Sequence, residues 1–102
     1  MENLSYEFAA SKQAAVLQQQ LLVGVVGSGD LEVLVEPHND LIRIQICTSV
    51  DGMGAIWQAL MQRLFASGQL PAMRIDINDF GATPGVVRLR LEQALEVLGL
   101  SA

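Results

Sequence analysis

Apolar and polar residues alternate along three stretches of the chain, which is the pattern of a strand with one buried face. The alternation covers residues 31–36, the segment with isoleucines at positions 42, 44 and 46, and residues 73–77. Each stretch is therefore predicted to form a strand. The residues expected to point inward are Leu31, Val33, Val35, Ile42, Ile44, Ile46, Met73, Ile75 and Ile77.

A β-hairpin is predicted at the first of these strands. The valine-rich run of residues 21–26 precedes it, and the residues Gly-Ser-Gly-Asp at 27–30 separate the two segments. A short connection that contains glycine between two extended segments is typical of a hairpin. Residues 37–40, with the sequence Pro-His-Asn-Asp, have the composition of a second tight turn.

Two later segments repeat apolar residues every three or four positions, which predicts helices. Asp51 is expected to cap the start of the first helix, which ends near Ser67 and Gly68. The second helix is expected to begin with Thr83 as its cap and Pro84 at its first position. The apolar faces comprise Ile56, Trp57, Leu60, Met61, Leu64 and Phe65 in the first helix and Val87, Leu91, Ala94, Leu95 and Leu98 in the second.

The order hairpin, strand, helix, strand, helix predicts the α+β class, with a single domain over residues 1–102. We expect two layers, in which a mainly antiparallel sheet of about four strands has both helices packed on one face. Residues 1–19 are expected to hold an edge strand and a linker, because Tyr6 and Phe8 alternate with polar neighbours.

The charge balance argues against nucleic acid as a ligand. Eleven Asp and Glu against six Lys and Arg give a net charge of −5, so few cations are available to neutralise phosphates. One His and one Cys provide no disulfide, metal-ligand cluster or Cys–His dyad, so we expect neither a metal site nor independent catalysis. No apolar run approaches the roughly 20 residues of a membrane span, and Glu2 and Glu7 stand where a signal peptide would be basic. The sequence predicts a cytoplasmic protein that binds, scaffolds or carries something.

Ser28 is the main candidate site. Its neighbours Gly27 and Gly29 have no Cβ, so a bulky group or another backbone can approach the serine closely. One interpretation is therefore an attachment point for a long group in phosphodiester linkage, with Asp30 orienting the tip or helping to hold a cation during the transfer. The other interpretation is a plain turn that Asp30 caps through its own backbone.

Four other residues carry weaker signals. Cys47 is either a thiol carrier or an inert small hydrophobe, and His38 is expected to be a solvated turn residue. Ser49 competes with Ser28 as a modification site but lacks the flanking glycines. Phe80, in a predicted connection, is either a core plug or a contact for a partner or for the carried group.

Three separated blocks resemble the acyl carrier (delta) subunits of bacterial malonate decarboxylases. They are residues 24–34 (GVVGSGDLEVL), 48–52 (TSVDG) and 78–85 (NDFGATPG), and the similarity extends over residues 20–98. The Ser-Gly-Asp core also occurs in the related carrier subunit of citrate lyase, which remains an alternative.

The resemblance implies a non-catalytic carrier, and therefore a phosphoprotein. Ser28 would hold 2'-(5''-phosphoribosyl)-3'-dephospho-CoA covalently, supported by Gly27, Gly29 and Asp30. The thiol of this arm would carry acetyl or malonyl groups between an acyl transferase subunit and the carboxy-lyase subunits, which convert malonate to acetate and carbon dioxide. A prosthetic-group transferase and a malonyl transferase would load the carrier. The competing hypotheses are a non-carrier binding or scaffold module and, least favoured, a small enzyme.

Overall fold

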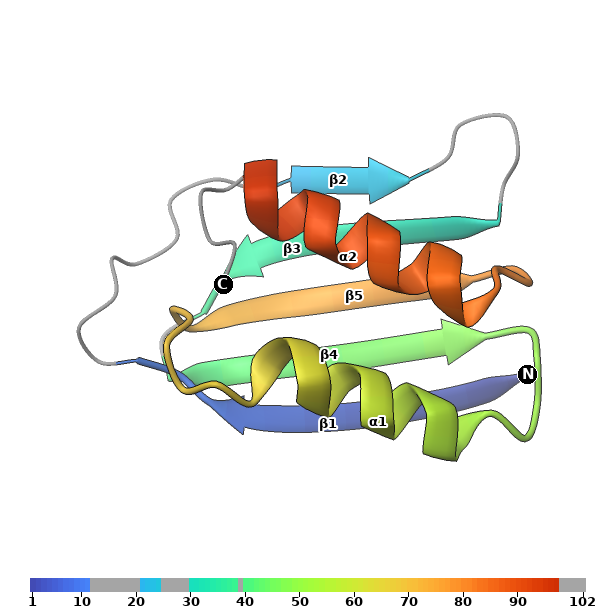
Figure 1. Ribbon diagram of the computed structural model, residues 1–102, viewed down its shortest axis with the longest axis horizontal. Helices are drawn as coiled ribbons and strands as arrows, with labels where there is room; N and C mark the ends of the chain where they lie inside the picture. The colour runs from blue at the N-terminus through green and yellow to red at the C-terminus, as the bar shows by residue number, and fades with distance from the viewer. Residues whose placement is uncertain (12–20, 25–29, 39, 98–102) are drawn as a thin grey trace.

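A five-stranded sheet with two helices on one face forms the fold in the computed structural model, which describes residues 1–11, 21–24, 30–38 and 40–97 (Figure 1). The predicted α+β class and the placement of both helices are confirmed. The elements are β1 (Glu2–Ala9), β2 (Leu21–Gly24), β3 (Leu31–Pro37), β4 (Leu41–Thr48), α1 (Gly54–Phe65), β5 (Met73–Asp79) and α2 (Pro84–Val97).

The strands lie in the order β1-β4-β5-β3-β2. The sheet is mainly antiparallel, as expected, but β4 and β5 run parallel and α1 joins them. The predicted hairpin is present, since β2 pairs with β3 from Leu21 opposite Val35 to Gly24 opposite Glu32. The turn after β3 does not join neighbouring strands, because β5 inserts between β3 and β4.

The fifth strand is β1, the expected N-terminal edge strand. Its residues Leu4, Tyr6 and Phe8 stand opposite the three isoleucines of β4 and pack against the core. The Tyr6 hydroxyl donates to the Gly54 carbonyl oxygen at 3.4 Å, which ties this edge to the start of α1. Burial and, to a smaller extent, the Glu2 carboxylate raise the pKa of Tyr6, which favours the protonated hydroxyl that donates to Gly54.

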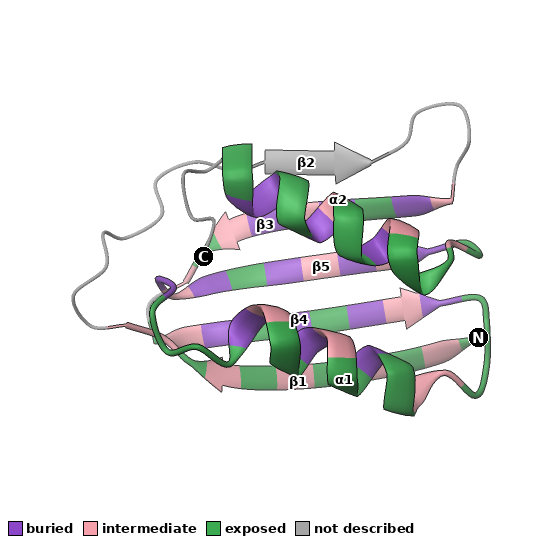
Figure 2. Ribbon diagram, in the orientation of Figure 1, coloured by how far each residue is buried: buried purple, intermediate pink, exposed green. Residues whose placement is uncertain are grey.

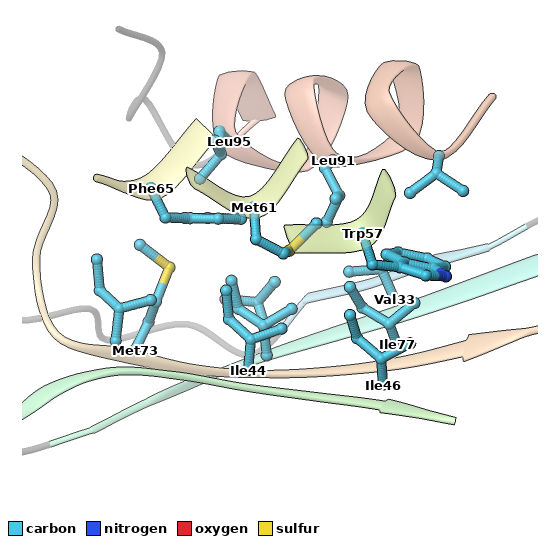
Figure 3. Close-up of a cluster of buried hydrophobic side chains, with 14 of the residues drawn as sticks. Val33, Ile44, Ile46, Trp57, Met61, Phe65, Met73, Ile77, Leu91 and Leu95 are labelled. Carbon is cyan, nitrogen blue, oxygen red and sulfur yellow. The ribbon is translucent and has the colours of Figure 1, made fainter. Parts of the chain in front are cut away.

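The core lies between the sheet and the two helices. All nine residues predicted to point inward from the strands are buried, and the alternation is visible along β3, β4 and β5 in Figure 2. In Figure 3, Trp57 of α1 lies above Ile46 and Ile77, Met61 above Ile44 and Phe65 above Met73. The buried Leu91 and Leu95 of α2 complete this layer. The opposite face is polar and carries the pairs Arg43–Glu7 and Arg74–Asp76.

Two predictions for α1 are wrong. Ile56 was expected in the core, but 44% of it is exposed because it lines the open space between α1 and α2. Asp51 does not cap the helix, since Met53 is the N-cap residue and makes no side-chain cap hydrogen bond. The turn through Gly52 (φ 83°) separates the aspartate from the helix, and its carboxylate pairs instead with the N-terminal amine at 3.0 Å.

The start of α2 agrees with the prediction. The Thr83 hydroxyl oxygen accepts the Val86 backbone N–H at 3.3 Å, and Pro84 is the first helical residue. Four of the five residues assigned to its apolar face are buried, and the fifth, Leu98, lies outside the described residues.

Replacing Met61 by Ala should lower the free energy of unfolding by about 2–5 kcal/mol, because the fully buried side chain leaves a cavity. The matched control on the same helix is Ile56→Ala, which should lower stability by only about 1 kcal/mol, because 44% of the residue is already exposed and no closed cavity is left. Urea denaturation of both variants measures the difference. Equal losses would contradict this packing.

Candidate functional site

One end of the sheet brings together segments that are far apart in the sequence. Strands β4 and β5 end there, β3 begins there, and both helices start there (Figure 1). We call this region the loop end and define it as Asp30, residues 48–53 and residues 79–84. Two backbone hydrogen bonds hold it, from the Phe80 N–H to the Asp30 carbonyl at 3.0 Å and from the Ser49 N–H to the Asp79 carbonyl at 2.9 Å.

Of the predicted attachment site, the structure describes Asp30. Ser28, Gly27 and Gly29 lie outside the described residues. Asp30 is half-buried, and its carbonyl anchors the hairpin connection to Phe80.

The Asp79 carboxylate is the hydrogen-bonding centre of the loop end. Only 4% of Asp79 is exposed. Its Oδ2 accepts the Thr48 hydroxyl at 2.8 Å, and its Oδ1 accepts the backbone N–H groups of Gly81 at 3.1 Å and Ala82 at 2.8 Å. The hydroxyl oxygen of Thr48 in turn accepts the Val50 N–H at 3.1 Å. One side chain thus fixes the connections that follow both β4 and β5.

Sequence reasoning assigned no role to Asp79, although the local signal was present. An aspartate followed by glycine two residues later is typical of a turn in which the carboxylate binds backbone N–H groups. Gly81 has φ 116°, a conformation that other residues rarely adopt. The bond to Thr48 depends on the parallel pairing of β4 with β5, in which Thr48 stands opposite Asp79.

Phe80 is exposed, which excludes the core-plug interpretation. With 59% of the residue accessible, its ring lies on the surface of the loop end while its backbone is held on both sides. A fixed backbone beneath an exposed aromatic ring is the arrangement expected of a contact residue.

The remaining candidates are spread over the molecule. Ser49 is exposed at the loop end, and Cys47 is half-buried on the polar face of β4, between Asn3 and Asn78 in register. His38 follows β3 at the opposite end of the sheet, where its Nδ1 accepts the Asp40 N–H at 3.3 Å, in agreement with a turn role.

Two negative findings apply to the part of the chain that the structure describes. It contains no group of three or more His, Cys, Asp and Glu residues that could hold a metal ion. None of its helices is long and apolar enough to cross a membrane.

Comparison with known proteins identifies the family. The family model of the malonate decarboxylase delta subunit (MdcD) matches residues 18–98. The chain belongs to the malonate decarboxylase delta subunit family. This confirms the resemblance drawn from the three sequence blocks, which extended over nearly the same residues.

Relatives of this delta subunit share almost its whole length. It is 58% identical to the malonate decarboxylase acyl carrier protein of Stutzerimonas stutzeri (strain A1501), covering 97% of this chain and 98% of the relative. The protein of the same name from Azotobacter vinelandii (strain DJ / ATCC BAA-1303) is 57% identical, covering 94% of this chain and 95% of the relative. A chain in the crystal structure of a Pseudomonas malonate decarboxylase hetero-tetramer in complex with malonate is 55% identical. It superposes with a TM-score of 0.85, and the alignment covers 97% of this chain and 100% of that one.

Replacing Asp79 by Ala should lower the free energy of unfolding by about 2–3 kcal/mol, because three donors lose their buried acceptor. Asp79→Asn should lose only about 1 kcal/mol, since its amide oxygen still accepts the two backbone N–H groups. Asp51→Ala is the matched control and should lose less than about 0.5 kcal/mol, because its ion pair is exposed. Urea denaturation measures all three, and a loss for Asp79→Ala no larger than that of the control would contradict the assigned role.

Proposed function

We propose that this delta subunit carries acetyl and malonyl groups for malonate decarboxylase on a prosthetic arm attached to Ser28, without catalysing a step itself. The observation that supports this most is the near full-length similarity to proteins named malonate decarboxylase acyl carrier protein. Partner subunits perform the conversion of malonate to acetate and carbon dioxide. The role of this chain is to hold the acyl group and present it.

The sequence around Ser28 supports the arm 2'-(5''-phosphoribosyl)-3'-dephospho-CoA. A serine hydroxyl accepts a phosphodiester linkage, and the flanking Gly27 and Gly29 leave the approach to it without side chains. The arm supplies a thiol that holds an acyl group as a thioester. Asp30 supports the site through its backbone, because its carbonyl oxygen accepts a hydrogen bond from the Phe80 N–H.

A carrier needs a rigid domain to which a mobile acyl group is attached; we call the rigid part the base. The base is the loop end, where hydrogen bonds to the buried Asp79 carboxylate and the pairing of β3, β4 and β5 limit backbone movement. Tethering the substrate to this base raises its effective concentration at each active site within reach. The rigid sheet therefore serves catalysis that takes place on other subunits.

The partners follow from the same proposal. The solved relative is part of a hetero-tetramer, and we infer that this chain assembles with the acyl transferase subunit and the carboxy-lyase subunits. A prosthetic-group transferase and a malonyl transferase load it in the cytoplasm. Its net charge of −5 favours encounter with basic surfaces on these enzymes.

Ser28→Ala should abolish attachment of the arm, because Ser28 is the single serine of the sequence with a glycine on each side. The chain is expressed together with the attachment enzymes, and its intact mass is measured. Ser49→Ala, which removes an exposed hydroxyl at the same end, is the matched control and should gain the full mass of the arm. Cys47→Ala should also be loaded, since the working thiol belongs to the arm.

An unmodified wild-type chain under these conditions would favour the non-carrier module. Loss of the added mass in Ser49→Ala but not in Ser28→Ala would move the attachment site to Ser49.

Phe80→Ala should weaken binding to the transferase subunit by at least about tenfold, because an exposed aromatic ring on a fixed backbone is a typical interface anchor. Leu89→Ala on α2 is the matched control, since Leu89 is also about half exposed but lies outside the loop end. Titration calorimetry across a salt series measures both variants and Asp30→Asn.

We expect salt to weaken binding of the wild type, because close opposite charges contribute to the encounter. An affinity that does not change with salt would contradict an electrostatic contribution to binding of the transferase subunit.

A further inference from the structure

A hollow opens between the two helices at the end of the molecule where both of them start (Figure 1). Its inner part reaches the core at the buried Trp57 and Val87, and its outer part is open to solvent. We call it the interhelix hollow and define it by six residues of the outer part: Ile56, Leu60, Arg63, Pro84, Gly85 and Arg88.

Apolar side chains line most of the hollow, and the carboxylate that reaches its inner part is already occupied. Both oxygens of Asp79 accept hydrogen bonds from within the loop end. At the opening, Ile56 is 44% exposed and Leu60 is half-buried beside it. Apolar surface left in water is unfavourable, and an apolar side chain of a partner removes it from water on binding. The hollow therefore suits a protein side chain better than a polar ligand.

Gly85 keeps the outer part of the hollow open. It lies in the first turn of α2 and does not have a positive φ. A Cβ at this position would meet no atom within 4 Å, so neither the backbone nor the packing of this chain requires a glycine. Alanine also forms helices more readily than glycine. What the glycine provides is a stretch of backbone that another molecule can approach closely.

Two arginines form the rim of the hollow, although the protein as a whole is acidic. Arg63 lies two turns after Ile56 on α1, which is about 10 Å along the helix, and Arg88 lies one turn after Pro84 on α2. Arg63 forms no ion pair with any residue that the structure describes, and Arg88 pairs with the exposed Glu92 of its own helix. A positive rim on a protein of net charge −5 favours a carboxylate on the partner at this one place.

The hollow continues the surface proposed above for binding the transferase subunit. Phe80, Ala82 and Pro84 follow one another closely between β5 and α2. The first is an exposed ring, and the other two line the hollow. Hydrogen bonds from this connection to Asp79 hold its backbone in place, so one partner surface can cover the ring and the hollow together.

We propose that the interhelix hollow is the docking site for a segment of the acyl transferase subunit. An apolar side chain of that segment packs on Ile56 and Leu60, against the open backbone of Gly85. A carboxylate about 10 Å further along the segment pairs with Arg63 and Arg88. The net negative charge of the protein assists the encounter, whereas the two arginines fix the orientation in which the subunits bind. This inference rests on the proposed function, because that function supplies the partner.

Replacing Gly85 by Ala tests the hollow without removing any contact within this chain. The added methyl group should weaken binding of the transferase subunit by at least about fivefold, because it lies where the two surfaces pack closely. The variant should unfold at the same urea concentration as the wild type or at a higher one, which excludes a folding defect. Gly54→Ala is the matched control. It makes the same change in the first turn of α1, but its Cβ would face Leu4 at 4.0 Å, and it should leave binding unchanged.

Arg63→Gln and Arg88→Gln should each weaken binding by up to about fivefold, the size of one exposed charge contact. Arg43→Gln is their matched control, since it removes a positive charge from an exposed ion pair on the opposite face of the sheet and should leave the affinity unchanged. The full chain, produced without the attachment enzymes, is titrated into the transferase subunit by calorimetry. The arm then takes no part in the measurement.

Three results would overturn the inference alone. In the first, the wild type binds the transferase subunit and Gly85→Ala binds it as tightly as Gly54→Ala does. In the second, the variants of the hollow weaken binding to the carboxy-lyase subunits instead. In the third, they abolish a self-association of this chain, which would make a second copy the occupant. A wild-type chain that does not bind the transferase subunit overturns the proposed assembly and this inference together.

Discussion

The parallel pairing of β4 with β5 determines which segments meet at the loop end. Two parallel neighbours need a crossover connection, and α1 supplies it across the face of the sheet. The helix must therefore start beyond the end of β4, and α2 starts beyond the end of β5, at the same edge. Because β3 runs antiparallel to β5, it begins at that edge as well. Asp30, Thr48 and Asp79 come from three distant segments and meet there for this reason.

The local sequence pattern was sufficient to predict the strands and helices, but not to predict which strands lie side by side in the sheet. The isoleucines at every second position of β4, and the spacing of Trp57, Met61 and Phe65, each follow from burying one face, and the structure places them as predicted. The insertion of β5 between β3 and β4 does not follow from any local pattern. The turn at residues 37–40 favoured direct adjacency, but strand pairing is decided by which apolar faces meet across the whole sheet.

The two errors in α1 have different causes, and neither can be read from the spacing of residues. Helical periodicity gives the direction of an apolar face but not how far a second helix covers it, so the exposure of Ile56 could not be read from spacing. An aspartate near a helix start predicts a cap only if the chain enters the helix at once, and the turn through Gly52 prevents this for Asp51. The role of Asp79 as a turn residue could have been predicted from the sequence. Its hydrogen bond to Thr48 could not, because it depends on the pairing of β4 with β5.

On the proposed carrier function, the tethered acyl group has to leave this subunit for each active site, so docked and free populations must stay within a few kcal/mol of each other. A short flexible tether gives an effective concentration in the millimolar range at any site within reach. The buried Asp79 carboxylate fixes the connections that follow β4 and β5. The movement that delivery requires is therefore confined to the tether, while the domain that holds it keeps its geometry.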